Sequence, residues 1–299
     1  MSTYKVAAIV VNWNQEGDTT ACLDSLRTVN DIPLHSILVD NGSQSKEVDR
    51  IEKQFPEVTL IRLSENRGPT GGRNAGIRYA LNEKFSHILL LDNDILTPPS
   101  FLSPLIDSLS DRAIGAVSPK ILHHPETSRI WCTGGMIDWS TGMQWSRGAG
   151  ELDRGQWDIA DTVDYLATCC LLAPCHVFQE AGLMDERYFI YYDDTDWSLR
   201  TKRLGYLCAY TPKSQIYHKV SSSLKAGSAS MDYYYARNRL LFFRTHAPAH
   251  QRLRLIVLYT ARALRYAHTL WLEGRAQNAS AVIRGVRDYY LARFGRGPI

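Results

Sequence analysis

The sequence has no apolar run long enough to form a membrane-spanning helix. Such a helix needs about 20 consecutive apolar residues, and no uncharged stretch of the 299 residues approaches that length. The N-terminus, MSTYKVAAIVVNWNQ, begins apolar but soon reaches two asparagines and has no cleavage site. It is therefore interpreted as a first strand rather than a signal peptide. We expect a cytoplasmic protein that does not cross a membrane.

The sequence also lacks cysteine pairs of the kind that bind zinc. Its six cysteines include no Cys-x-x-Cys spacing, and three of them lie in the apolar segment LATCCLLAPC at 166–175. A free thiol in such a segment behaves as a small core side chain. This pattern favours reduced cysteines in the cytoplasm over a disulfide framework.

Acidic residues become scarce toward the C-terminus. From His250 onward there are nine arginines against Glu273 and Asp288, a net charge of +7 in a chain whose total is +3. A total this small does not indicate a nucleic-acid partner, and none is expected. The sequence therefore combines a mildly acidic body with a basic C-terminal end.

The basic end has the period of a helix over residues 252–272, with Arg254, Arg262 and Arg265 on one side of the helical wheel. One interpretation is an ordinary packed helix with a solvated arginine stripe. The other is a helix that contacts an anionic membrane surface peripherally, or a partner in a homodimer. The pattern alone leaves both interpretations open.

The first third of the chain alternates short apolar runs with helix-period segments. This pattern predicts a mostly parallel α/β sheet with helices on both faces. The predicted strands are 5–11, 35–40, 58–63 and 87–92, and the predicted helices are about 17–28, 44–54 and 72–83. Further strands are expected at 115–121, 164–173, 206–212 and 214–219, with an irregular hairpin over 131–145, a short helix at 173–182 and helical structure from residue 232.

Polar residues follow each of the first four strands, at the edge where such sheets bind ligands. They are Asn12 and Asn14, then Asp40, then Asn66, then Asp92, Asn93 and Asp94. Two carboxylates two positions apart suit Mg²⁺ or Mn²⁺ carrying a phosphate. The glycine-rich stretch NRGPTGGRNAG at 66–76 fits either a diphosphate-binding loop or a simple turn.

The segment YFIYYDDTDWSLR at 188–200 places three aspartates behind a run of aromatic residues. Acidic residues are favoured at a helix start by the helix dipole, and Asp196 and Arg200 are spaced to pair across one helical turn. A partly desolvated carboxylate is also a better base than an exposed one. The segment is thus predicted either to begin a helix or to present its carboxylates to a group that needs them.

These motifs together resemble the inverting GT-A nucleotide-sugar glycosyltransferases of glycosyltransferase family 2, nearest to the rhamnosyltransferase and galactofuranosyltransferase branch. The resemblance rests on the order and spacing of VVNWN, VDNGS, NRGPTGGRNAG, LLLDND, YFIYYDDTDWSLR, YHKVSSS and YYYARNRLLFF. It implies a glycosyltransferase domain over 1–246, with a nucleotide-binding half at about 1–118 and an acceptor-side half at about 119–246. Residues 247–299 would form a basic helical extension.

The resemblance also implies roles for individual residues. Asp194 would be the catalytic base, and Asp92, Asp94 and His218 would hold Mn²⁺ or Mg²⁺. The nucleotide-sugar donor would contact Asn12, Asn14, Asp40, Asn66, Arg73, Asp92 and Asn93. The acceptor side would include Tyr192, Asp193 and Trp197. The small polar residues 221–228 suit either a loop that closes over substrate or a connector.

The implied reaction transfers a sugar from a nucleoside-diphosphate donor, such as dTDP-rhamnose or a UDP-sugar, to a hydroxyl of a saccharide or lipid-linked acceptor in cell-surface polysaccharide assembly. One alternative is a sugar-phosphate nucleotidyltransferase, which would need a basic glycine-rich loop near the first strand. Another is a non-catalytic saccharide-binding module built on the tryptophans and tyrosines, which would have no use for a base beside a metal set.

Overall fold

The computed structural model describes residues 4–220 and 227–298. Its first third alternates strands and helices, and the four strands predicted there are confirmed to within one residue at each end. The elements are β1 (Val6–Asn12), α1 (Glu16–Arg27), β2 (Leu34–Asp40), α2 (Ser45–Gln54), β3 (Thr59–Arg62), α3 (Gly68–Asn82) and β4 (His87–Asp92).

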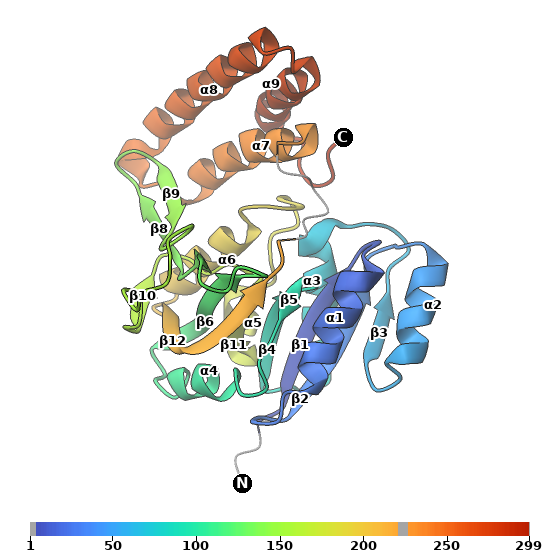
Figure 1. Ribbon diagram of the computed structural model, residues 1–299. Coiled ribbons are helices and arrows are strands. Elements are labelled where there is room, and N and C mark those ends of the chain that lie inside the picture. Colours follow the sequence, from blue (N-terminus) through green and yellow to red (C-terminus); the bar gives the residue numbers. More distant parts are fainter. Residues whose placement is uncertain (1–3, 221–226, 299) are drawn as a thin grey trace.

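The second half completes one large mixed sheet. Its elements are β5 (Ile95–Leu96), α4 (Ser103–Ser108), β6 (Ile114–His123), β7 (Ile130–Cys132), β8 (Gly135–Asp138), β9 (Met143–Ser146), β10 (Asp161–Val163), β11 (Cys170–Pro174), α5 (Cys175–Ala181), α6 (Asp193–Arg203) and β12 (Leu207–His218). The sheet order is β10-β12-β6-β11-β4-β1-β2-β3, and β5 and β7 pair with its members (Figure 1). Every long strand runs in the same direction except β11.

Two strand predictions in this half were wrong. Residues 164–173 do not form one strand, because the chain leaves the sheet after β10 and re-enters it only at β11. Residues 206–212 and 214–219 do not form two strands, because β12 continues through them with a register shift between Thr211 and Gln215. A bulge absorbs the irregular residues without ending the strand.

The register places the ends of the central strands together. Asn12 in β1 lies opposite Asp40 in β2, and Val11 lies opposite Asp92 in β4. The polar residues that follow these strands therefore gather at one edge, as predicted from the sequence.

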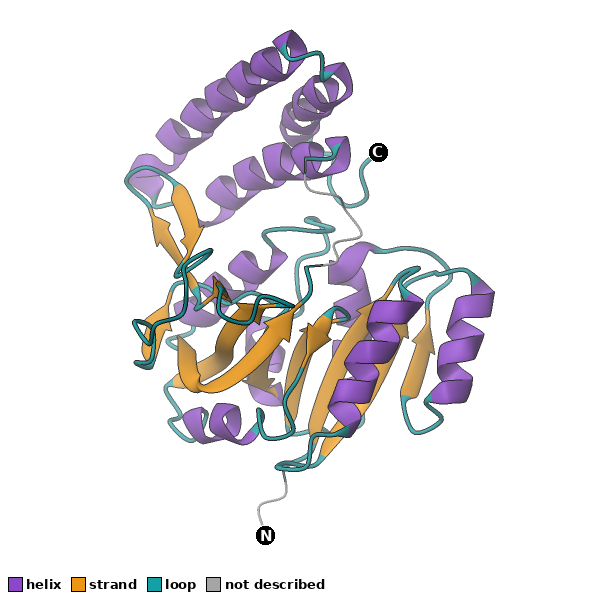
Figure 2. Ribbon diagram, in the orientation of Figure 1, coloured by secondary structure: helices purple, strands orange, loops and turns teal. Residues whose placement is uncertain are grey.

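Hydrophobic residues fill both faces of the sheet. Along β1, Val6, Ala8 and Val10 pack with α1 and α4, whereas Ala7 and Ile9 pack with α3 and α5 on the other face. Side chains alternate between the faces of a strand, so an apolar run without alternation is buried on both sides. Figure 2 shows the strands as a layer with helices around it.

Helix α3 begins four residues earlier than predicted, so most of the glycine-rich stretch is helical. Pro69 in its first turn favours this start because its fixed φ suits a helix N-terminus. A Cβ on Gly72 would lie 2.6 Å from Cγ1 of Val11, and one on Gly76 would collide with Ile9. These glycines bring α3 close to β1.

Three helices follow the sheet: α7 (Ala229–His246), α8 (Ala249–Leu272) and α9 (Ala276–Tyr290). They pack on one another at the end of the sheet that carries the polar residues (Figure 1). Their core includes Leu241, Leu255 and Val286, and it extends to Tyr188 and Tyr192 before α6. Within the described ranges, none of the helices is both long and apolar enough to span a bilayer. Most of residues 221–228, for which either a substrate-closing loop or a connector was predicted, lie outside the described residues.

Candidate active site

A cavity of about 560 Å³ lies between the carboxyl ends of β1 and β4 and the start of α7. Its walls come from segments that are far apart in the sequence, and nine of the predicted site residues line it. They are Asn66, Arg73, Asp92, Asn93, Asp94, Tyr192, Asp193, Asp194 and His218. The two acidic motifs therefore share one cavity.

Asp92, Asp94 and His218 form a group that fits a divalent metal ion. One ligand atom from each residue lies within 4.8 Å of the others. β12 ends at His218, which pairs with Ile95 beside Asp94, and Nε2 of His218 is 3.1 Å from Oδ1 of Asp94. Trp131 packs edge-on against the imidazole at 4.5 Å. Two carboxylates and an imidazole are a suitable ligand set for Mn²⁺ or Mg²⁺.

Arg73 connects the metal-binding motif to the helix that carries the predicted base. Its guanidinium donates to Asp92 at 2.6 Å and to Asp193 at 3.1 Å, and Thr70 also donates to Asp193 at 3.0 Å. Asp193 is only 3% exposed, and both bonds end on its Oδ2 oxygen. Burial raises the pKa of Asp193, and the charge of Arg73 opposes that shift.

Asp194 keeps more of its carboxylate open to the cavity than Asp193 does. Its hydrogen bonds are local and come from the backbone N–H and the hydroxyl of Thr195. Burial raises the pKa of Asp194 to about 7, and the neighbouring Asp193 carboxylate contributes to the rise. A carboxylate with a pKa near neutrality, in the same cavity as a metal-binding group, has the properties of a general base.

The segment before α6 has a strained backbone. Phe189, Tyr191 and Tyr192 all have positive φ angles, between 62° and 71°, which are unfavourable for residues with a Cβ. Helix α7 holds them in place. The amide of Asn238 donates to the carbonyls of residues 188, 190 and 191 at 2.7–3.2 Å.

Arg237, which is fully buried, adds bonds to the carbonyls of residues 187, 188 and 295. No role was predicted for Arg237 or Asn238 from the sequence. The only signal was a charged residue and an amide inside the aromatic run YYYARNRLLFF. Together these two side chains position the segment that leads to Asp194.

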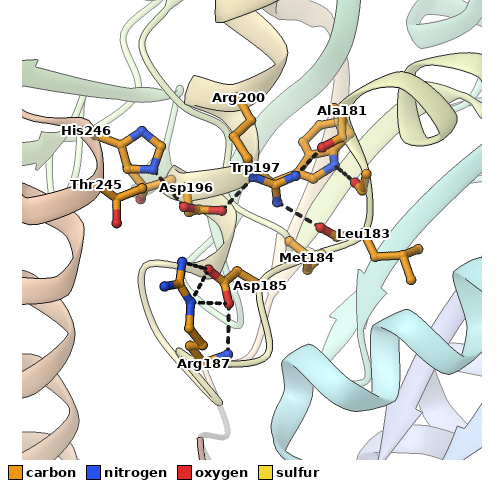
Figure 3. Close-up of polar contacts among 12 residues, drawn as sticks. Ala181, Leu183, Met184, Asp185, Arg187, Asp196, Trp197, Arg200, Thr245 and His246 are labelled. Atoms are coloured by element: carbon orange, nitrogen blue, oxygen red, sulfur yellow. Dashed lines mark hydrogen bonds and ion pairs between the residues drawn. The ribbon is translucent and has the colours of Figure 1, made fainter. Parts of the chain in front are cut away.

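Asp196 has a structural role, and its predicted pairing with Arg200 is confirmed. Its carboxylate accepts from Arg200 at 2.8 Å and contacts Nε2 of His246 in α7 at 2.7 Å (Figure 3). Burial alone would raise the pKa of Asp196, but these two partners hold it below its usual value. The contact with His246 was not anticipated, because it joins residues 50 positions apart.

The acceptor-side prediction for Trp197 needs correction. Trp197 is fully buried, its indole stacks on Phe178 at 4.5 Å, and its N–H donates to the carbonyl of Gly182 (Figure 3). It does not line the cavity. One helical position past Asp196, it faces the sheet, where α6 must bury an apolar side chain.

Three residues predicted to contact the nucleotide instead form hydrogen bonds within and between the loops that follow β1 and β2. Asn12 is fully buried and donates to Ser43 at 3.1 Å, and Asp40 accepts from the backbone N–H of Ser43 at 3.1 Å. Asn14 accepts from the N–H of Gln44 at 3.0 Å. None of the three lines the cavity, so direct contact with a nucleotide stays a prediction for them.

Neighbouring residues reach the cavity instead. Trp13 is 38% exposed and lines it, as does Asn41, whose amide donates to Asn66 at 3.2 Å and to the carbonyl of Gly68 at 3.0 Å. The amide of Asn93 donates to Thr19 at 2.9 Å. For the loops after β1 and β2, the sequence motifs thus located the segments that border the cavity but not the side chains that line it.

The mixed sheet and the cavity at its edge belong to a glycosyltransferase of the GT-A type. The family model "Glycosyl transferase family 2" matches residues 7–170, and the chain belongs to this family. It is similar to the dTDP-rhamnosyl transferase RfbF of Shigella flexneri, with 24% identity over 84% of each chain.

Two further proteins are similar to the chain. The first is the N-acetylglucosaminyl-diphospho-decaprenol L-rhamnosyltransferase of Mycobacterium tuberculosis, with 26% identity over 70% of this chain and 74% of that protein. The second is a solved structure, the mannosyltransferase PcManGT of Pyrobaculum calidifontis in complex with GDP-Man and Mn²⁺. It shares the fold with a TM-score of 0.58 at 16% identity, over 97% of this chain and 89% of that one.

Proposed function

We propose that the protein is a metal-dependent, inverting glycosyltransferase. It would move a sugar from a nucleoside-diphosphate donor, dTDP-rhamnose or a UDP-sugar, to a hydroxyl of a saccharide or lipid-linked acceptor in cell-surface polysaccharide assembly. The observation that carries the proposal is the presence of Asp194 and the Asp92–Asp94–His218 group in one cavity. The rhamnosyltransferase relatives support the choice of donor.

In this mechanism the acceptor hydroxyl attacks the anomeric carbon from the face opposite the diphosphate. Asp194 takes the hydroxyl proton, and the bond from the anomeric carbon to the diphosphate breaks with its electron pair. A divalent ion held by Asp92, Asp94 and His218 would stabilise the negative charge of the leaving diphosphate. Arg73 holds Asp92 and Asp193 in place, which fixes the metal site relative to α6.

A thermal-shift experiment tests the donor site. We expect UDP or dTDP to raise the melting temperature in the presence of Mn²⁺ and to lose that effect in excess chelator, because a ligand that binds only the folded state stabilises it. Asp94→Ala is expected to remove the metal-dependent part, whereas Asp24→Ala, an exposed aspartate of α1, serves as the matched control. Stabilisation that is insensitive to chelator would contradict the metal role.

We also propose that α8 mediates peripheral contact with an anionic membrane. Leu253, Val257 and Trp271 on this helix are 74, 59 and 63% exposed, among the arginines of the basic C-terminal end. Helices of this kind lie in the interface of anionic bilayers. We expect co-sedimentation with vesicles containing phosphatidylglycerol that weakens at high salt and in Leu253→Ser. Unchanged sedimentation of that variant would contradict the proposal.

A further inference from the structure

A second cavity, of about 330 Å³, lies between α7, α8 and α9, outside the candidate active site. Figure 1 shows these helices stacked above the sheet. Tyr235 lines both this cavity and the active-site cavity, so the two share a wall. Tyr235 therefore marks the boundary between the two cavities.

Two arginines line the second cavity and lie against the same aromatic ring. The guanidinium carbon of Arg239 is 5.1 Å from the ring centroid of Tyr259, and that of Arg262 is 4.9 Å from it. The two cations are therefore within about 10 Å of each other. Arg239 is partly buried and Arg262 is exposed, so solvent screens the repulsion between the two like charges on the side of Arg262.

Neither arginine forms an ion pair with a carboxylate in the part of the chain that the structure describes. The remaining residues, 1–3, 221–226 and 299, carry no acidic side chain. The one carboxylate in the cavity wall, Asp232, accepts instead from Asn278 at 2.6 Å and from Tyr266 at 3.3 Å. With the two arginines and Asp232, the described residues of the cavity wall carry a net charge of +1.

Arg239 also connects this cavity to the predicted base. Its Nε donates to the hydroxyl of Tyr192 at 2.6 Å. Tyr192 lines the active-site cavity and is followed directly by Asp193 and Asp194. A ligand bound by Arg239 would therefore lie one side chain away from the segment that positions the base.

We propose that Arg239 and Arg262 bind a phosphate or diphosphate group of the acceptor. Guanidinium groups form paired, charge-assisted hydrogen bonds with phosphate oxygens, and the tyrosines around them add hydroxyl donors. The inference rests on the proposed function, since it places the acceptor's hydroxyl near Asp194 and its phosphate in the cavity beyond Tyr235. The phosphate could belong to a lipid carrier or to a phosphorylated glycan, because the chemistry of recognition is the same.

Calorimetric titration of the full chain with farnesyl diphosphate tests this proposal. Excess chelator is present throughout, so that the active-site metal cannot contribute to binding. We expect Arg262→Gln and Arg239→Gln to weaken binding at least tenfold. The matched control is Arg265→Gln, which removes the same charge from α8 at a residue that does not line the cavity and should bind as the unaltered protein does.

Inorganic pyrophosphate and farnesol identify the source of the phosphate. Tighter binding of farnesyl diphosphate than of pyrophosphate would assign a lipid carrier, whereas equal binding would assign a phosphorylated glycan. Binding of farnesol as tight as that of farnesyl diphosphate, equal binding by Arg262→Gln, or an equal loss in Arg265→Gln would overturn the proposal. The metal-dependent stabilisation by UDP or dTDP is measured separately, so failure of the donor site would be recognised independently.

Discussion

Replacing Asp194 with asparagine should stabilise the protein while it abolishes sugar transfer. The pKa of Asp194 rises from an ordinary value of 3.8 to about 7 because the carboxylate is buried beside Asp193. At neutral pH the folded state therefore carries a charge that its surroundings disfavour. Asparagine has nearly the same shape and no charge, so it removes this repulsion together with the base.

The magnitude follows from the size of the shift. Each pKa unit corresponds to about 1.4 kcal/mol, which gives an upper limit of about 4 kcal/mol for Asp194. The carboxylate is partly exposed and solvent screens it, so we expect a gain of about 1–2 kcal/mol above pH 7. Because the folded-state pKa is raised, ionisation of Asp194 increasingly destabilises the folded state as pH rises from about 4 to 7. The gain should therefore disappear near pH 4.

Urea unfolding at pH 8 and pH 4.5, together with a transfer assay, measures both effects. Asp196→Asn is the matched control, because it changes an aspartate on the same helical turn whose pKa is lowered by His246 and Arg200. Breaking that buried network should cost about 3 kcal/mol at pH 8. If Asp194→Asn is destabilising at pH 8, or retains turnover, the reasoning about Asp194 is refuted.

Three further predictions concern the site and its support. The value of kcat/KM should rise with pH and level off above about pH 7, because Asp194 acts as a base only when deprotonated; a flat profile from pH 5 to 8 would argue against this role. Asn238→Ala should cost about 1–3 kcal/mol in urea unfolding and lower kcat, since it leaves the carbonyls of Ile190 and Tyr191 without their side-chain donor; unchanged kcat would mean that the segment holds its shape without Asn238. Gly72→Ala should cost about 1–3 kcal/mol, because its Cβ would lie 2.6 Å from Val11, whereas Gly17→Ala has open space and should be neutral or slightly stabilising.

Local sequence patterns determined the framework of the molecule. The positions of β1 to β4, the helices between them and the pairing of Asp196 with Arg200 all follow from periodicities within a few residues. The placement of Asp92 and Asp94 at a strand end follows from the same pattern. Because strand ends of a parallel sheet share an edge, the location of the site was also predictable from the sequence.

Only the tertiary structure decided how similar residues divide their roles. Asp193 contacts Arg73, 120 positions away, Asp194 faces the cavity, and Asp196 is bound by His246, although the three acids occupy four consecutive positions. The tertiary structure alone also showed that the glycines of α3 allow close packing on β1. It alone showed that Arg239 and Arg262 lie against Tyr259. Local propensity cannot specify these contacts, because each depends on which distant segment packs against the residue once the chain has folded.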